Sequence, residues 1–113
     1  MIKTVTGNID TANVKNVFIH EHIQCASNDM LHTFGKDWID TDILSDYASG
    51  ILTQINEKWN VNLFVDGTPI DLGRNISLLK SVSEKSGTYI VASTGLYHYP
   101  SCITYGNDET EIA

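Results

Sequence analysis

Two histidines separated by one residue are the strongest candidates for chemistry in this 113-residue sequence. His20 and His22 follow residues 17–19, a β-branched and aromatic run that favours a β-strand. Side chains alternate between the two faces of a strand, so both imidazoles should lie on one face, about 6.6 Å apart along the strand. Two imidazoles that converge from this distance can bind one divalent cation. The spacing therefore predicts half of a metal site, with Glu21 on the opposite face.

Short His-x-His matches also arise by chance, so the neighbouring elements decide the strength of this hypothesis. Residues 61–65 form a nearly continuous apolar run that ends at Asp66, and residues 89–93 form another that ends before Thr94. Strands of this kind are buried on both faces, as in a parallel sheet covered by helices. Asp66 is either a functional carboxylate or the cap of the turn that follows it.

Two amphipathic helices separate the predicted strands. Residues 40–59 begin with an acidic N-cap signal, and their apolar residues recur at helical spacing, which predicts about four turns. We expect this apolar stripe to pack into the core: Ile43, Leu44, Tyr47, Ile51, Leu52, Ile55 and Trp59. Residues 74–85 predict a second helix, which ends before Gly87.

The order strand-helix-strand-helix-strand predicts an α/β fold with a parallel sheet and right-handed crossovers. Folds of this class build their sites at the carboxyl ends of the strands. The polar residues of interest fall at or just beyond these ends: His20, His22, Asp66, Thr94 and Tyr97. Their placement favours a site over a chance match.

Two further segments are harder to assign. Residues 2–9 predict a short β-hairpin, with Gly7 and Asn8 as its turn. Residues 23–39 show no clean period, and we interpret them as an active-site loop with one irregular helical turn. His32 falls in this loop, where it either approaches the site or is exposed without a role.

Composition bounds the class of protein. A chain of 113 residues with 42% hydrophobic and 19% charged residues suits one small globular domain. The net charge of −7 argues against nucleic acid or an anionic membrane as a partner. The sequence shows neither a secretory signal nor an apolar run of about 20 residues, so we expect a soluble, cytoplasmic protein.

The two cysteines, Cys25 and Cys102, lack the spacing of a zinc motif. A disulfide between them is one alternative, and packed, reduced thiols are the simpler interpretation. Cys25 comes three residues after His22, but we expect a packed thiol there and not a metal ligand.

Several blocks of the sequence resemble the phosphotriesterase family of the amidohydrolase superfamily. Residues 4–9 (Thr-Val-x-Gly-x-Ile) are similar to its opening hairpin, and residues 18–23 (Phe-Ile-His-Glu-His-Ile) match its first signature. Residues 66–75, with Asp-Gly-Thr and Gly-Arg-Asn, are similar to its second block. Residues 83–97 resemble the run through its third strand. The four blocks occur in the family's order and cover nearly the whole chain.

The resemblance implies a TIM (β/α)8 barrel that binds two divalent metal ions, with zinc as the expected metal. It implies that His20 and His22 bind the more buried ion and that Tyr97 lies over the bridging hydroxide and the substrate. It also implies that Arg74 ties a loop by hydrogen bonds. Residues 1–113 would then be the N-terminal part of a single barrel domain, truncated before the family's carboxylated lysine, two further histidines and aspartate.

For the intact enzyme, the resemblance implies hydrolysis of an ester-like bond by a hydroxide that two metal ions activate. The expected substrate is a small lactone, phosphorylated lactone or phosphotriester, and a homodimer or other self-association stays open. We expect the chain alone to be inactive, with the inward face of its sheet, including Phe18, uncovered. The alternative is a non-catalytic remnant or interaction module that binds at most one metal ion weakly.

Overall fold

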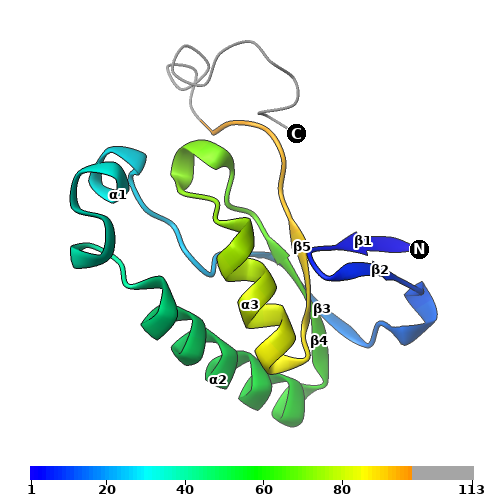
Figure 1. The fold of residues 1–113 in the computed structure, drawn as a ribbon. Coiled ribbons are helices and arrows are strands. Elements are labelled where there is room, and N and C mark those ends of the chain that lie inside the picture. The colour runs from blue at the N-terminus through cyan, green and yellow to red at the C-terminus, as the bar shows by residue number, and fades with distance from the viewer. Residues whose placement is uncertain (98–113) are drawn as a thin grey trace.

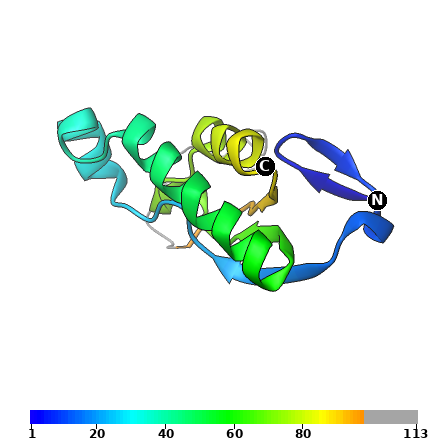
Figure 2. The same ribbon diagram turned by 90° about the horizontal axis from the view of Figure 1, so that it is seen from below.

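The computed structural model describes residues 1–97, and their central feature is a parallel sheet of three strands. The strands are β3 (Asn16–Glu21), β4 (Val61–Asp66) and β5 (Tyr89–Ala92), in the spatial order β3-β4-β5. Helices α2 (Thr41–Trp59) and α3 (Ile76–Ser86) connect consecutive strands and cover one face of the sheet (Figures 1 and 2). The predicted α/β class and the strand-helix order are confirmed.

The hydrophobic core lies between this sheet and the two helices. β4 is the central strand, with a hydrogen-bonded strand on each side, and five of its six residues are buried. Val82 on α3 and Ile90 on β5 are fully buried. The core cluster comprises Ala48, Leu52, Phe64, Leu78, Leu79, Val82 and Ile90.

Both helices begin and end with the signals that the sequence carries. The Asp40 carboxylate accepts hydrogen bonds from the backbone N–H groups of Asp42 and Ile43, at 2.9 and 3.1 Å, and so caps α2. The side chain of Asn75 caps α3. Gly87 ends α3 with a φ of 69°, a left-handed conformation that glycine adopts at low cost.

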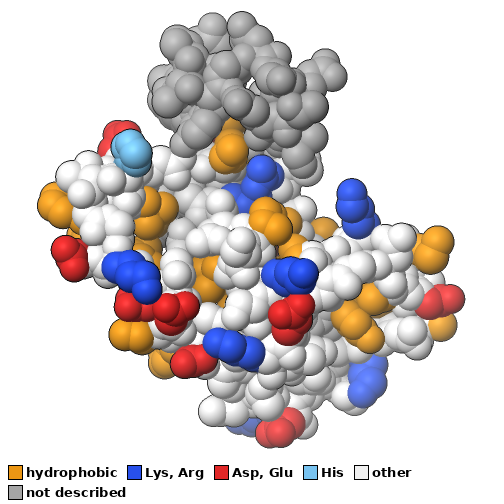
Figure 3. Space-filling model, viewed as in Figure 1, with side chains coloured by type: hydrophobic (Ala, Val, Ile, Leu, Met, Phe, Trp, Pro, Cys, Tyr) orange, Lys and Arg blue, Asp and Glu red, His pale blue; other side chains and the backbone are white. Residues whose placement is uncertain are grey.

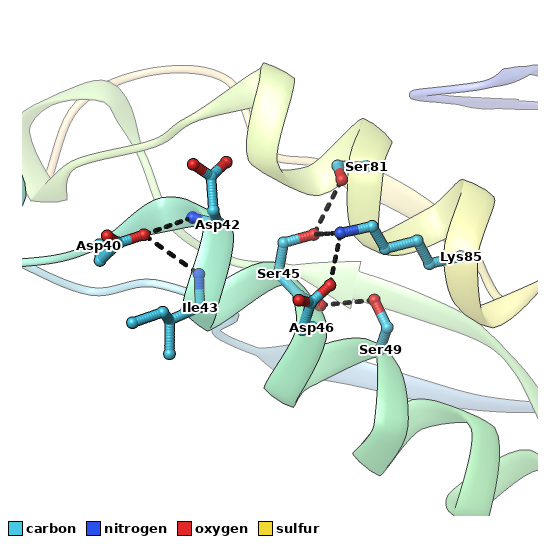
Figure 4. A network of polar contacts seen from close by, with 8 residues as sticks. All are labelled: Asp40, Asp42, Ile43, Ser45, Asp46, Ser49, Ser81 and Lys85. Carbon is cyan, nitrogen blue, oxygen red and sulfur yellow. Dashed lines mark hydrogen bonds and ion pairs between the residues drawn. The ribbon is translucent and has the colours of Figure 1, made fainter.

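A polar cluster joins the two helices where they pack together (Figure 4). The hydroxyl groups of Ser45 on α2 and Ser81 on α3 lie 2.8 Å apart. Lys85 donates hydrogen bonds to the Ser45 hydroxyl at 3.1 Å and to the Asp46 carboxylate at 2.7 Å. The Ser49 hydroxyl donates to the Ser45 carbonyl oxygen at 2.6 Å. Small side chains therefore form the α2 surface that faces α3.

The prediction that the apolar stripe of α2 is core packing is confirmed for Leu44, Leu52 and Ile55 and wrong for the other four residues of the stripe. Leu52 is 3% exposed, but Ile43, Tyr47 and Trp59 are 70%, 67% and 54% exposed. The buried residues of α2 are Ser45, Ala48, Ser49 and Leu52. This buried face is rotated away from the predicted stripe because the helix turns its small residues toward α3. Part of the stripe instead lines an open groove of about 300 Å³, together with Phe18.

A β-bulge interrupts β3 between Phe18 and Glu21, the stretch that contains His20. Phe18 pairs with Phe64 and Glu21 pairs with Asp66, so β3 has one residue more than β4 over this stretch. The extra residue shifts the alternation of side chains. Phe18 packs against the core cluster, whereas Ile19 is 79% exposed. The expectation that Phe18 belongs to the uncovered face of the sheet is therefore wrong. The exposed side chain is that of Ile19.

The N-terminal hairpin is confirmed, but its turn is not where the sequence places it. β1 (Ile2–Thr4) and β2 (Gly7–Ile9) are antiparallel, with Thr4 opposite Gly7. Val5 and Thr6 therefore form the turn, and Gly7 and Asn8 belong to the second strand. The backbone N–H of Val5 donates to the carbonyl oxygen of Ile90 at 2.9 Å, which attaches the hairpin to β5 (Figure 1).

The segment predicted as a loop, residues 23–39, contains more helix than expected. α1 (Asn28–Phe34) begins at the N-cap Ser27, and a 3₁₀ turn, Gly35–Asp37, follows it. His32 therefore lies in a helix and not in a loop. Two other 3₁₀ turns comprise Thr11–Asn13 and Ile70–Leu72.

Charged groups of both signs are interspersed on the face drawn in Figure 3. Within residues 1–97, no helix is both long enough and apolar enough to span a membrane.

Candidate metal site

The structure brings the two predicted histidines together at the carboxyl end of β3. His20 lies in the strand, and His22 is one residue beyond its end. Their ring centroids are 5.3 Å apart, and the ring planes meet at 68°. Both residues are exposed, so an ion can reach the imidazoles from solvent. The geometry is compatible with two ligands of one cation, and the role as ligands stays a prediction.

His22 has a buried hydrogen-bond partner that sequence reasoning missed. Its Nδ1 lies 2.8 Å from the hydroxyl oxygen of Thr68, a residue that is 1% exposed. The same hydroxyl donates to the carbonyl oxygen of Gln24 at 2.9 Å. Thr68 lies two residues beyond the end of β4, so its position near a strand end was the available signal. Its role depends on which side chain the neighbouring strand places beside it, and the sequence does not give that.

Asp66 acts as the cap of its turn, which is one of the two interpretations that the sequence left open. Its two carboxylate oxygens accept hydrogen bonds from the backbone N–H groups of Ile23 and Thr68, each at 2.9 Å. The side chain is 1% exposed, and both oxygens are used by the backbone. Asp66 therefore holds the site together and does not face an ion.

Gly67 lets the backbone pass close beneath the histidine pair. Its N–H donates to the carbonyl oxygen of Glu21 at 2.8 Å, which continues the contact between the two strand ends. A Cβ at this position would lie 3.0 Å from both Cδ2 and Nε2 of His20. Any side chain at residue 67 would thus press on the imidazole of His20.

The third predicted site residue, Tyr97, lines the same cavity as both histidines. This cavity has a volume of about 430 Å³. The side chain of Tyr97 is 73% exposed, and its backbone N–H donates to the Asp71 carboxylate at 2.9 Å. The other lining residues are Cys25, Gly67, Pro69, Leu72, Ser93, Thr94 and Leu96. The cavity therefore combines two imidazoles, one phenol and several apolar side chains.

Arg74 supports one wall of the cavity from outside. Its guanidinium donates to the carbonyl oxygen of Ser93 at 2.7 Å, and the N–H of Ser93 donates to the carbonyl oxygen of Asp66 at 3.0 Å. Arg74 thus ties down the start of the segment that leads to Tyr97. This contact agrees with the loop-tying role that the resemblance implies.

The remaining candidates lie apart from the histidine pair or outside the described residues. His32 is exposed on α1 and is not among the residues that line this cavity. Cys25 has a free, exposed thiol at the cavity wall, so the expectation of a packed thiol is wrong. Cys102 lies outside residues 1–97, where the chain is described.

The donor set fits half of a metal centre. Imidazole nitrogen is a common ligand of zinc, which takes four ligands in most protein sites. Among residues 1–97, no three histidine, cysteine or carboxylate side chains are grouped so that they could hold a metal ion. Two imidazoles are therefore present, and further ligands would have to come from outside the described part of the chain.

The described residues form a parallel βαβαβ unit with two histidines at the carboxyl end of its first parallel strand, β3. The sequence matches the model of the phosphotriesterase family over residues 1–108, and the chain belongs to that family. Phosphotriesterase homology proteins from Mycobacterium tuberculosis strains CDC 1551 / Oshkosh and ATCC 25618 / H37Rv are each 32% identical over 98 residues. These matches cover 87% of this chain and 30% of each relative.

The structure resembles a crystal structure of a mutant PTE-like lactonase from Deinococcus radiodurans. The TM-score is 0.72 at 26% sequence identity, over 81% of this chain and 28% of the lactonase. The chain therefore spans about 30% of the length of the curated relatives it matches. Its elements correspond to part of a TIM barrel, which confirms the expected fold. Membership of the family also relates the chain to hydrolases.

Proposed function

We propose that this chain supplies the first metal-binding strand of a metal-dependent hydrolase that acts on an ester-like bond. One observation carries the proposal: His20, His22 and Tyr97 line one cavity at the carboxyl ends of the parallel strands. Membership of the phosphotriesterase family supports the same reaction class. The substrate class comprises small lactones, phosphorylated lactones and phosphotriesters.

The two histidines are the residues that would hold one divalent ion, and zinc suits their nitrogen donors. When bound, such ions supply an activated water and polarise the carbonyl or phosphoryl oxygen of the substrate. A second ion, as in the family's two-metal centre, would need ligands beyond those that residues 1–97 provide.

The chain's own side chains would orient the substrate in the cavity. Leu72 and Leu96 offer apolar walls, which suit the hydrocarbon part of a small ester. Tyr97 is exposed, and the structure gives its hydroxyl no hydrogen bond within residues 1–97, so the phenol is available to a substrate oxygen. Tyr97 resembles the aromatic position of the family's lactonases, and the structural neighbour is a lactonase. Both observations favour a lactone over a phosphotriester.

A chimera tests this function directly. The part of this chain that superposes on the Deinococcus lactonase would replace the matching 28% of that enzyme. We expect the folded chimera to bind divalent metal and to hydrolyse lactones. The pair His20→Ala and His22→Ala should remove one bound metal ion and nearly all turnover, because two ligands of that ion are lost.

His32→Ala is the matched control, since His32 is an exposed histidine on α1 that does not line the cavity. Metal content would be measured by mass spectrometry, and turnover would be measured with lactone and phosphotriester substrates. A folded chimera whose metal content and turnover survive the double substitution would contradict the proposal.

A further inference from the structure

We propose that Thr68 fixes the tautomer of His22 and leaves Nε2 as the nitrogen that binds the ion, an inference that rests on the proposed function. The starting point is a chain of two hydrogen bonds. His22 Nδ1 lies 2.8 Å from Thr68 Oγ1, and Thr68 Oγ1 lies 2.9 Å from the carbonyl oxygen of Gln24.

The direction of the second hydrogen bond follows from the groups involved. A threonine hydroxyl has one hydrogen, and a carbonyl oxygen can only accept. The Thr68 hydrogen must therefore point to Gln24. If it pointed to His22 instead, two oxygen atoms would face each other at 2.9 Å without a hydrogen between them, in a buried place.

The direction of the first hydrogen bond then follows. Because the Thr68 hydroxyl has given its only hydrogen to Gln24, its oxygen acts as an acceptor toward His22. Nδ1 of His22 must carry the hydrogen and donate it. In the neutral ring, Nε2 is then the nitrogen with a free lone pair, as a metal ligand requires.

The surrounding contacts keep Thr68 in this position. Thr68 is 1% exposed, and its backbone N–H donates to the Asp66 carboxylate at 2.9 Å. The hydroxyl is therefore held before any ion arrives. Partners of this kind raise the affinity of a histidine for a metal, and their loss costs about 10–100-fold.

His20 gives an internal comparison. Within residues 1–97, the structure gives the ring nitrogens of His20 no hydrogen bond, so its tautomer is not set in this way. A substitution of Thr68 should therefore change the ring of His22 and leave the tautomer of His20 as it is.

The test uses the metal-free 113-residue chain, labelled with ¹⁵N in its histidines. Solid-state ¹⁵N NMR distinguishes Nδ1–H from Nε2–H and tolerates self-association, and the signals lost in His22→Ala assign that ring. We expect His22 to be the Nδ1–H tautomer. Thr68→Val keeps the shape and removes the hydroxyl, so His22 should move toward Nε2–H. Thr68→Ser keeps the hydroxyl and should preserve the Nδ1–H form.

The second readout is zinc affinity, measured by competition with a chromophoric chelator. Thr68→Val should weaken binding about 10–100-fold, and Thr68→Ser should restore it. An Nε2–H His22 in the wild type, or a Thr68→Val variant with unchanged tautomer and affinity, would overturn the inference. If Thr68→Val does not fold, the tautomer of His22 in the wild type and in Thr68→Ser still tests the inference. A tautomer that follows Thr68 in a chain that binds no zinc would support the tautomer assignment and count against the histidine pair as a metal site in this chain.

Discussion

The carboxylate of Asp66 accepts a hydrogen bond from the backbone N–H of Ile23 at 2.9 Å, across the ends of two neighbouring strands. Ile23 follows His22 directly, and the other carboxylate oxygen accepts the N–H of Thr68. One buried side chain therefore sets the positions of both partners of the His22–Thr68 hydrogen bond. The proposed metal site therefore depends on this contact, even though Asp66 is not among the residues that line the cavity.

Asp66→Ala should lower the free energy of unfolding by about 2–3 kcal/mol, because it leaves two backbone N–H groups without their acceptor. Asp66→Asn should cost less, since its single carbonyl oxygen can still accept one of them. Unfolding in urea, monitored by circular dichroism, measures the free energy of unfolding of both variants. Asp29→Asn, at an exposed residue of α1, is the control, and equal midpoints for all variants would contradict the structural role.

Tyr97→Phe should slow lactone hydrolysis in the chimera and leave its stability nearly unchanged. The side chain is 73% exposed, and the hydrogen bond to Asp71 uses the backbone N–H, which phenylalanine retains. Steady-state kinetics and thermal unfolding of the same preparation separate the two effects. Tyr47→Phe is the matched control, at a tyrosine that is 67% exposed on α2. Normal kinetics with a loss of about 1 kcal/mol in stability would instead indicate a packing role.

Local signals in the sequence were sufficient for the order of strands and helices. The cap Asp40 begins α2 and the left-handed Gly87 ends α3 as expected, because capping is a property of a few adjacent residues. Asn75 caps α3, which begins two residues later than expected. The hairpin turn was misplaced because glycine and asparagine are common turn residues, whereas the observed ladder pairs Thr4 with Gly7.

Features that depend on contacts between distant segments could not be predicted from the sequence. The bulge between Phe18 and Glu21 depends on how β3 pairs with β4, and no residue type in β3 predicts it. The spacing of Tyr47 and Ile51 shows an apolar face but not whether a neighbour covers that face. The His-x-His spacing and the strand-end position make His20 and His22 candidates, and the family resemblance adds Tyr97; their roles stay predictions. Thr68 also lies near a strand end, but its role emerges only from its contact with His22.

Acid should weaken the N-terminus of α2. The backbone N–H groups of Ile43 and Asp42 donate to the Asp40 carboxylate and hold its pKa below the ordinary value. Because the folded-state pKa is the lower one, this stabilisation is complete above the unfolded pKa, about 3.9. It is lost as the pH falls through the folded-state pKa.

The comparison of wild type with Asp40→Asn isolates this effect, since asparagine caps helices about as well as aspartate but does not titrate. Urea midpoints at pH 7 and at pH 3 would be compared for both proteins. The advantage of the wild type should shrink at the lower pH. A difference between the proteins that stays constant with pH would contradict the role of the Asp40 charge.

The open side of the sheet predicts how the 113-residue chain behaves by itself. β3 is an edge strand among the described residues, and exposed edges pair readily with other chains. Beside it, Ile43 and Tyr47 on α2 are 70% and 67% exposed. Covering each large apolar side chain would contribute roughly 1.5–3 kcal/mol, so association has a substantial driving force.

We therefore expect the chain to self-associate and to be catalytically silent, since residues 1–97 offer only two clustered imidazoles. Tyr47→Lys should reduce association, because it places a charge on the exposed apolar surface. Glu57→Gln changes the net charge by the same amount at an exposed polar position of α2 and should have no such effect. Analytical ultracentrifugation and light scattering measure the assembly, and hydrolase assays measure turnover. A monodisperse wild-type monomer that unfolds cooperatively and shows metal-dependent turnover would mean that the open groove and the edge of β3 need no partner.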